Sequence, residues 1–380
     1  MKVVQPDSSP SDDTLIAARE RALLAPYAMH SADSAGRKHP EPPHPYRGPF
    51  QRDRDRIVHS AAYRRLSAKM QVFTGERGDY HRTRLTHTLE VASVARTVGR
   101  ALKLNEDLIE ALALAHDLGH PPFGHAGEDA LNECLVDEGG FSHNRQALTI
   151  LEELEQRYPE FPGLNLSCEV LEGQATRISK SSGVSRPLLE VQVVEAADSV
   201  AYDTHDADDA LELGLLTLPE LLEVPLWNEA ARRVRQRHGE LTGKQLKHAV
   251  LHELIDWQVG DLVDRLQRRL AAGDLNSAAD VRAAPYLAEV SPELAKLKRQ
   301  LEKFLYDRVY RHPEVLRLRS RAQAMLREMF AGYVARPELL PKSFLARAEQ
   351  TGLRRSVGDY LAGMTDRYAQ QEHARLFQAK

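Results

Sequence analysis

The sequence has few cysteines, no long apolar run and no excess of positive charge, and each absence excludes a class of protein. Its 380 residues contain two cysteines, Cys134 and Cys168, which are far apart and form neither a disulfide framework nor a paired-cysteine metal motif. No stretch approaches the ~20 apolar residues of a membrane-spanning helix. The first residues, MKVVQPDSSPSDD, lack the apolar segment of a secretory signal. We therefore expect a soluble, cytoplasmic protein.

The common sequence motifs of nucleotide and hydrolase sites are also absent. The chain contains no GxxxxGK[ST], GxGxxG, GxSxG or HExxH pattern. Neither cysteine has a histidine beside it in sequence, so no thiol nucleophile is indicated. Phosphate groups would therefore have to be held by side chains, and arginine suits them because it forms bidentate charged hydrogen bonds.

Charge is distributed unevenly along the chain, although the net charge of −4 gives no overall attraction to nucleic acids. Residues 47–84 contain ten Arg/Lys and four Asp/Glu, whereas residues 195–212 contain seven acidic residues and no basic one. Such runs are most often solvated helix faces. The alternative is a site where a polyanion meets bound cations, and the sequence leaves both interpretations open.

Hydrophobic periodicity predicts an all-α fold. Residues 30–49 carry five prolines and are expected to be irregular, but from about residue 50 apolar residues recur at helical spacing. Asn105 is a suitable N-cap for the helix NEDLIEALALAHDL, since its side chain can accept a hydrogen bond from a free backbone N–H. Further helices are predicted at 126–138, 144–157, 187–203, 246–271, 291–308, 313–334 and 342–350. No convincing strand pattern is present, and the long C-terminal helices are expected to pack on the central part.

The segment LALAHDLGHPPFGHAGED, residues 112–129, contains an adjacent pair of metal-ligand types, His116 and Asp117. A divalent metal site needs three or four nitrogen or oxygen ligands that converge from separate elements. Adjacent helical residues point about 100° apart, so these two can share one ion only where the helix ends. The glycine and prolines that follow predict such an end.

Two distant segments offer further ligands and a phosphate-binding group. His87 lies on the preceding predicted helix, and Asp198 lies in an apolar helix, where a carboxylate is costly to bury unless it is paired or binds a cation. Tyr202 and Asp206 follow Asp198 at helical spacing and share its face. Arg84 precedes His87 by three residues on the same face and could reach a phosphate beside the metal.

Three histidines and a glutamate near the adjacent pair supply proton-transfer chemistry. His125 and Glu128 are spaced i,i+3, so the carboxylate can orient the imidazole and raise its basicity. His120 lies in the loop before them, and His143 begins a further helix. A purely structural role is common for a lone histidine, but this density of histidines favours function.

The order His87, His116-Asp117, Asp198 resembles the HD-domain metal phosphohydrolases. Seven words narrow the resemblance to the deoxyguanosinetriphosphate triphosphohydrolase (dGTPase)-like proteins over residues 45–378: RDRDRIVHSAAYRRLSAKMQVF, HRTRLTHTLEVASVAR, AHDLGHPPFGHAGE, GGFSHNRQAL, GLNLSCEVLEG, DSVAYDTHDADDAL and GDYLAGMTDRYA. This resemblance implies a helical HD-domain core and hydrolysis of a deoxynucleoside triphosphate (dNTP) to deoxynucleoside plus inorganic triphosphate. It also implies one divalent metal ion, for which Mn, Mg, Co, Ni, Fe and Zn remain open, and a homo-oligomer.

The resemblance also implies a role for each candidate residue. The metal ligands would be His87, His116, Asp117 and Asp198. His125 and Glu128 match the catalytic pair, and His143 matches a phosphate-side histidine that we group with them. The substrate-binding residues would be Arg84, His120 and Tyr202 at the phosphates, and Gln71 and Asp206 at the sugar 3′-hydroxyl.

The chain departs from the family pattern at two places. Thr176-Arg177 replaces the usual Lys-His, so a phosphate-binding lysine is missing and Arg177 takes its place, which is not a neutral exchange. KMQVF replaces the usual KTQVF around Gln71. These changes leave the metal ligands intact and bear on nucleotide affinity.

The resemblance suggests a division into a lead-in at 1–45, an HD-domain catalytic core at 46–215 and a helical C-terminal region at 216–380 packed on the core. Two alternatives to a dNTP triphosphohydrolase remain open. One is another HD phosphohydrolase, such as a nucleotidase or phosphodiesterase. The other is a nucleotide- or single-stranded-DNA-binding regulator with weak catalysis, which the basic stretch at 47–84 would suit. If the protein is an enzyme, a dNTP or single-stranded DNA could act as its effector.

Overall fold

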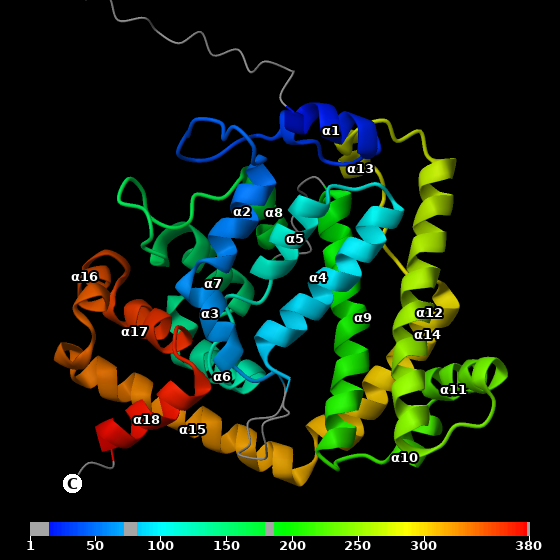
Figure 1. The fold of residues 1–380 in the computed structure, drawn as a ribbon. Helices are drawn as coiled ribbons and strands as arrows, with labels where there is room; N and C mark the ends of the chain where they lie inside the picture. Colours follow the sequence, from blue (N-terminus) through cyan, green and yellow to red (C-terminus); the bar gives the residue numbers. More distant parts are fainter. Residues whose placement is uncertain (1–14, 72–81, 179–185, 378–380) are drawn as a thin grey trace, which may run out of the picture.

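The structure is a computed structural model that describes residues 15–71, 82–178 and 186–377, and the regular elements in these ranges are helices (Figure 1). Extended pairing within the same ranges is limited to isolated bridges, such as the one between Arg37 and Ser167. The prediction of an all-α fold is confirmed. None of the helices in these ranges has both the length and the apolar character needed to cross a membrane.

Eighteen α-helices lie within the described residues. Those up to residue 212 are α1 (Leu15–Leu23), α2 (Pro49–Val58), α3 (Ala61–Arg65), α4 (Arg84–Ala101), α5 (Glu106–Ala115), α6 (Gly124–Cys134), α7 (His143–Thr149), α8 (Cys168–Thr176) and α9 (Leu189–Glu212). Those that follow are α10 (Leu218–Leu222), α11 (Pro225–His238), α12 (Gly243–Ala272), α13 (Ala278–Ala283), α14 (Pro292–Leu305), α15 (Pro313–Ala335), α16 (Lys342–Thr351), α17 (Leu353–Ala362) and α18 (Asp366–Phe377). Short 3-10 turns lie at Ser31–Asp33, Leu66–Ala68, Val136–Glu138 and Pro337–Leu339, and π-helical turns at Ile150–Leu154 and Tyr306–Tyr310.

Several of the predicted helices agree with observed ones to within three residues at each end. The helices predicted at 246–271, 313–334 and 342–350 correspond to α12, α15 and α16. The helix predicted at 187–203 is longer, because α9 continues to Glu212 through the acidic run, whose carboxylates are paired with Arg82 and Lys247. The polar segment near 215–245 forms α11, where Leu226, Trp227 and Ala230 supply a buried stripe.

The lead-in is less irregular than expected, because α1 lies within it. LIAARERAL consists largely of good helix formers, and α1 buries Ala17. The proline-rich part after Asp33 has no further helix before α2. Its Arg37 donates to Asp53 of α2 from 2.5 Å and to the backbone of Asn165 from 2.5 Å, and both side chains of this ion pair are buried. These contacts tie the lead-in to the core.

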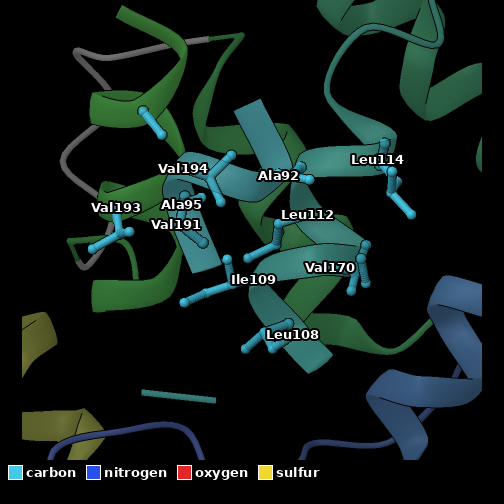
Figure 2. Close-up of a cluster of buried hydrophobic side chains, with 14 of the residues drawn as sticks. Ala92, Ala95, Leu108, Ile109, Leu112, Leu114, Val170, Val191, Val193 and Val194 are labelled. Atoms are coloured by element: carbon cyan, nitrogen blue, oxygen red, sulfur yellow. The ribbon is translucent and has the colours of Figure 1, made fainter. Parts of the chain in front are cut away.

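The largest apolar core lies around α5, which packs against α2, α4, α8 and α9. Figure 2 shows the centre of this core, where Leu112 of α5 lies among Ala92 of α4 and Val191 and Val194 of α9. Seven of the ten residues of α5 are buried, which is why its sequence is apolar almost all round. The active-site segment that follows α5 is thereby held on a rigid element.

Two further cores join the C-terminal helices to this centre. One lies among the end of α9, α11, α12 and α14, with the fully buried Trp227 inside it. The other lies among α6, α15, α17 and α18, with Tyr333 and Leu326 fully buried. Figure 1 shows α15 running along one side of the molecule beneath α6 and leading to α16–α18. The C-terminal helices thus cover α6, which carries His125 and Glu128.

Candidate active site

Three helices bring the four predicted metal ligands together. His87 lies on the first turns of α4, His116 is the C-cap of α5 with Asp117 next to it, and Asp198 lies in the middle of α9. α5 is capped at its start by Asn105, whose side chain accepts from the backbone N–H of Leu108, as predicted. Because α4 and α9 both pack on α5, residues 87, 117 and 198 meet at its C-terminal end.

Distances within this group are those of an ion-binding cluster. Ligand atoms of His87, His116 and Asp117 all lie within 4.8 Å of one another. Asp198 joins them through Oδ1, which lies 3.1 Å from Nε2 of His87 and 3.7 Å from Nε2 of His116. Nitrogen and carboxylate oxygen donors in this combination suit a divalent transition metal.

The tautomer of His116 fits a metal ligand. Its Nδ1 lies 2.6 Å from the backbone carbonyl of Ala113 and therefore carries the proton that it donates there. The unprotonated Nε2 is buried and has no hydrogen-bond partner among the described residues. Burial lowers the pKa of this imidazole below its usual value, so the ring is neutral. A neutral imidazole fixed by a backbone carbonyl and free at Nε2 is the arrangement found around metal-bound histidines.

Both carboxylates of the group are ionised and each is paired with an arginine. Burial alone would raise the pKa of Asp117, but the charge of Arg84 and the hydrogen bond with His120 hold it well below its usual value. Nη1 of Arg84 lies 2.8 Å from Oδ2 of Asp117. Arg84 is fully buried, so its guanidinium group lies directly beside the candidate metal centre, as its spacing from His87 predicted.

Arg177 pairs with the other carboxylate. Its Nη2 lies 2.9 Å from Oδ2 of Asp198, and its Nε lies 3.4 Å from Oδ1 of Asn144. The pKa of Asp198, which burial would raise, is lowered by the hydrogen bond with His87 and by the charge of Arg177. The position at which the sequence departs from the family pattern therefore contacts a candidate metal ligand.

The break between α5 and α6 places the remaining histidines in one cluster. Nδ1 of His120 lies 3.1 Å from Oδ1 of Asp117, and the rings of His120 and His143 stack with centroids 3.8 Å apart. Gly119 makes this approach feasible, since a Cβ there would lie 1.9 Å from the backbone oxygen of His143. The cluster thus shares Asp117 with the metal-ligand group.

Glu128 lies between two imidazoles rather than pairing with one. Its Oε2 is 3.3 Å from Nδ1 of His125, whereas its Oε1 is 2.8 Å from Nδ1 of His143. The side chain of His125 is 61% exposed and that of His143 is 18% exposed. His125 is therefore the accessible imidazole of the cluster, and His143 the one that Glu128 holds more closely.

Tyr202 and Asp206 lie at one end of the site, as their shared face on α9 predicted. The hydroxyl of Tyr310 donates to Oδ2 of Asp206, and the hydroxyls of Tyr202 and Tyr310 are 2.8 Å apart. Burial raises the pKa of Asp206 to about 6. Oδ1 of Asp206 and Oε1 of Gln71 are buried and have no hydrogen-bond partner among the described residues, so both are available to a ligand.

Three further residues at this site have no role assigned from the sequence. Tyr310 lies in a π-helical turn at the end of α14, more than 100 residues from Asp206, and no local pattern connects the two. His205 is buried with its ring 5.8 Å from that of His87, and burial lowers its pKa to about 2. Lys69 is buried and donates to the backbone carbonyl of His120 from 2.5 Å. Lys69 and His205 lie within two of the seven family words, RDRDRIVHSAAYRRLSAKMQVF and DSVAYDTHDADDAL, whereas Tyr310 lies in none of them.

The arrangement combines a candidate metal centre, a buried arginine and a carboxylate with two imidazoles. Cationic and metal-bound groups can stabilise the charge that develops on phosphate oxygens. An imidazole that a carboxylate orients can accept or donate a proton. These are the requirements of phosphoryl-group hydrolysis.

Comparisons with known proteins agree with this chemistry. Residues 84–203 match the HD domain, and residues 288–375 match the phosphohydrolase-associated domain. Three similar proteins carry the name deoxyguanosinetriphosphate triphosphohydrolase-like protein. The one from Thiobacillus denitrificans is 46% identical over 93% of this chain and 97% of its own length. Those from Ralstonia pickettii and Bordetella pertussis are each 44% identical, over 93% and 97% of this chain and 94% and 99% of their own lengths.

Proposed function

The chain belongs to the family of the deoxyguanosinetriphosphate triphosphohydrolase-like proteins and is a metal-dependent phosphohydrolase of the HD-domain type, and we propose that it hydrolyses dNTPs of the dGTP type to deoxynucleoside and inorganic triphosphate. The observation that carries the proposal is the meeting of two groups at Asp117. Oδ1 of this carboxylate lies 3.4 Å from Nε2 of His116 in the metal-ligand group and 3.1 Å from Nδ1 of His120 in the His120–Glu128–His143 cluster.

His87, His116, Asp117 and Asp198 would hold one divalent ion. When bound, such an ion polarises a phosphate oxygen and stabilises the charge that develops on it. The protein contributes the fixed orientation of the ligands, because Ala113 sets the tautomer of His116 and the two arginines hold the carboxylates. The identity of the bound ion is open among Mn, Mg, Co, Ni, Fe and Zn.

Arg84 would bind the triphosphate. Its side chain is buried beside Asp117, so its charge is poorly screened by water and attracts phosphate oxygens strongly. The neutral ring of His120 and the ring of His143, which stacks on it, would hold the phosphates by hydrogen bonds. Burial and the nearby Arg84 keep the pKa of His120 well below its usual value, which supports this neutral form.

His125 would transfer the proton. It is the exposed imidazole of the cluster, and Glu128 orients its Nδ1 and leaves Nε2 for the substrate. In this position His125 either takes a proton from the attacking water or gives one to the 5′ oxygen of the leaving deoxynucleoside. In both cases Glu128 stabilises the charged ring.

The free oxygens of Gln71 and Asp206 would accept a hydrogen bond from the sugar 3′-hydroxyl. Both atoms are buried acceptors without a partner among the described residues, and such atoms are costly to leave unsatisfied. Tyr202 and Tyr310 close this end of the site and hold the second oxygen of Asp206. The sugar 3′-hydroxyl would therefore supply a hydrogen-bond donor to these unpaired acceptor oxygens.

The basic stretch at 47–84 gives little support to a nucleic-acid-binding regulator. Apart from Arg84 inside the candidate site, most of its described arginines form ion pairs within the chain: Arg47, Arg52, Arg54, Arg56, Arg65 and Arg82. Lys69 is buried. Charges that are neutralised or buried in this way contribute little to a phosphate-binding surface.

A location in the cytoplasm and assembly into a homo-oligomer remain part of the proposal. The two cysteines are free thiols, which supports a reducing compartment. Light scattering with and without a mixture of dNTPs tests assembly, and a dependence of assembly on dNTPs or on single-stranded DNA would identify either one as an effector.

One assay tests the proposed reaction. The purified protein is incubated with each dNTP singly and with all four together, with Mg²⁺ or Mn²⁺, and the products are separated by chromatography. The expected products are deoxynucleoside and tripolyphosphate. Release of orthophosphate or of a nucleoside monophosphate would assign the chain to another phosphohydrolase reaction, and binding without turnover would favour a regulator.

A further inference from the structure

Asp366, the first residue of α18, is bonded to two segments of the active site. Its Oδ2 accepts from the backbone N–H of Met70 at 3.0 Å, and its Oδ1 accepts from the backbone N–H of Phe123 at 2.9 Å. The side chain is 8% exposed. One carboxylate from the C-terminal region therefore connects two segments that lie 243 and 296 residues away in sequence.

Lys69 forms a second connection between the same regions. Its Nζ donates to the backbone carbonyl of His120 at 2.5 Å and to that of Ala362, the last residue of α17, at 3.0 Å. The backbone carbonyl of Lys69 accepts from the N–H of Arg84 at 2.9 Å. Thus the segment around Lys69, the loop after Asp117 and the turn between α17 and α18 form one hydrogen-bonded unit.

Phe123 needs such support because its backbone is in an unfavourable conformation. Its φ is 65°, in the left-handed region that residues with a Cβ rarely adopt, and Gly124 follows with a φ of 57°. Phe123 is the N-cap residue of α6 and has no side-chain cap of its own. The conformation of Phe123 sets the direction in which α6 starts, and His125 lies on the first turn of that helix.

We propose that Asp366 is a positioning residue of the active site, which acts through Phe123 on His125 and Glu128 and through Met70 on Gln71. The inference rests on the proposed function, because it concerns the residues assigned there to proton transfer and to the sugar. Asp366 and Ala362 both lie in the region that matches the phosphohydrolase-associated domain. The proposal therefore gives this region a role in holding the catalytic loop.

A carboxylate suits this position better than any other side chain of its size. Each of its two oxygens accepts from a different backbone N–H. Asn has the same shape but offers one acceptor oxygen, and its NH₂ group faces the other N–H. Asp366→Asn should therefore release either Met70 or Phe123 while the packing of α18 is kept.

The test compares Asp366→Asn with Glu372→Gln in the full-length protein. Glu372 is a buried carboxylate of the same helix, bonded to Tyr333 and Arg375 and to no residue of the site. With the metal bound, we expect Asp366→Asn to lower kcat by about 10- to 100-fold, since small misplacement of a catalytic group has effects of this size. Metal content should stay at the wild-type level. Glu372→Gln should keep kcat within about twofold at a comparable loss in Tm.

Hydrogen exchange provides a readout that needs no substrate. Amides in residues 119–127 and 69–71 should exchange faster in Asp366→Asn than in the wild type and remain protected in Glu372→Gln. Unchanged exchange in Asp366→Asn, or equal losses of kcat in the two variants in proportion to Tm, would overturn the proposal. If the wild type releases no triphosphate, the proposed function fails by itself, while the exchange result still decides whether Asp366 fixes the loop.

A second variant covers the case in which Asp366→Asn does not fold. Asp366→Glu keeps the charge and both acceptor oxygens, but its longer side chain displaces the two backbone amides. We expect a lower kcat, with KM and metal content close to those of the wild type. A wild-type kcat in Asp366→Glu, together with wild-type exchange, would also contradict a positioning role.

Discussion

Glu128 holds His143 at two points, since its Oε1 lies 2.8 Å from Nδ1 of the ring and 2.9 Å from the backbone nitrogen of the same residue. Burial would raise the pKa of Glu128, but hydrogen bonds from His125 and His143 lower it below its usual range. The glutamate is therefore an ionised acceptor, and its Oε1 is already hydrogen-bonded to His143. His125, whose Nδ1 lies 3.3 Å from Oε2 of Glu128, is the less tightly held and more exposed imidazole of the cluster.

His125→Ala should abolish turnover and spare the metal. We expect kcat to fall by about 10²- to 10⁴-fold, the usual contribution of a general acid or base. Metal content by mass spectrometry should not change, because His125 lies outside the metal-ligand group. His373→Ala is the matched control. It removes a histidine of α18 that is bonded to Glu328 of α15, and it should keep full activity. A fully active His125→Ala would show that proton transfer is assigned to the wrong residue.

Asp117→Asn should remove the metal and with it the stabilisation that metal gives. Wild-type protein stripped by a chelator should regain both activity and Tm when Mn²⁺ is added, with a gain of about 2.7 kcal/mol at 100 times Kd. Asp117→Asn should show neither gain, whereas Asp129→Asn, which alters an exposed carboxylate paired with Arg319, should behave as the wild type. Calorimetric titration with Mn²⁺ measures this directly, and wild-type affinity in Asp117→Asn would exclude Asp117 as a ligand.

Arg177→Ala should weaken metal binding, although Arg177 is not one of the proposed metal ligands. Arg177 holds the second oxygen of Asp198, and loss of a group that orients a metal ligand typically changes affinity or activity by about 10- to 100-fold. Arg282→Ala, which removes a surface pair with Glu172 of α8, is the control. If the Kd for Mn²⁺ is the same in both variants and only KM for dNTP rises in Arg177→Ala, Arg177 binds phosphate instead of positioning Asp198.

Asp203 of α9 and Lys298 of α14 form a buried ion pair. Replacing only one of the two residues should lower the free energy of unfolding more than replacing both. Nζ of Lys298 lies 2.7 Å from Oδ2 of Asp203, and both residues are buried. Lys298→Met leaves an unpaired buried carboxylate and should lower the free energy of unfolding by about 3–5 kcal/mol. The double variant Lys298→Met/Asp203→Leu should recover much of this loss in urea denaturation. Additive losses in the double variant would mean that the pair is not energetically coupled.

Lys69 should make stability rise with pH above neutrality. Burial, with a contribution from Arg65, lowers the pKa of Lys69 from 10.5 to about 7 in the folded state. The unfolded chain therefore binds more protons than the folded chain between pH 7 and 10.5, and the free energy of unfolding increases with pH across this window. The slope contributed by one group is at most about 1.4 kcal/mol per pH unit. Urea denaturation from pH 7 to 10 should show a smaller slope in Lys69→Met, and an unchanged slope would contradict the assignment.

Much of the fold could be predicted because local signals are strong where helices are long or well capped. The cap at Asn105 and the end of α5 at His116 follow from residues within one turn of each position. α11 escaped prediction, since its apolar stripe is short and its polar face dominates the composition. The extension of α9 to Glu212 also escaped, because its acidic residues look unfavourable until the partners of Asp208, Asp209 and Glu212 are known, which are Lys247 on α12 and Arg82 before α4.

The sequence by itself determined the residue types of the site and their order: a ligand pair at a helix end, a glycine–proline break, and a histidine–glutamate pair at the start of the next helix. These depend on backbone conformation and spacing over a few residues, which local sequence controls. Tertiary structure alone decided which partners these residues have. Glu128 is held closer to His143 than to His125, Arg177 binds Asp198, Tyr310 binds Asp206 and Asp366 supports Phe123. Such contacts join residues from 15 to 243 positions apart, and they form only when the packing of α4, α5, α9 and the C-terminal helices brings them within hydrogen-bonding distance.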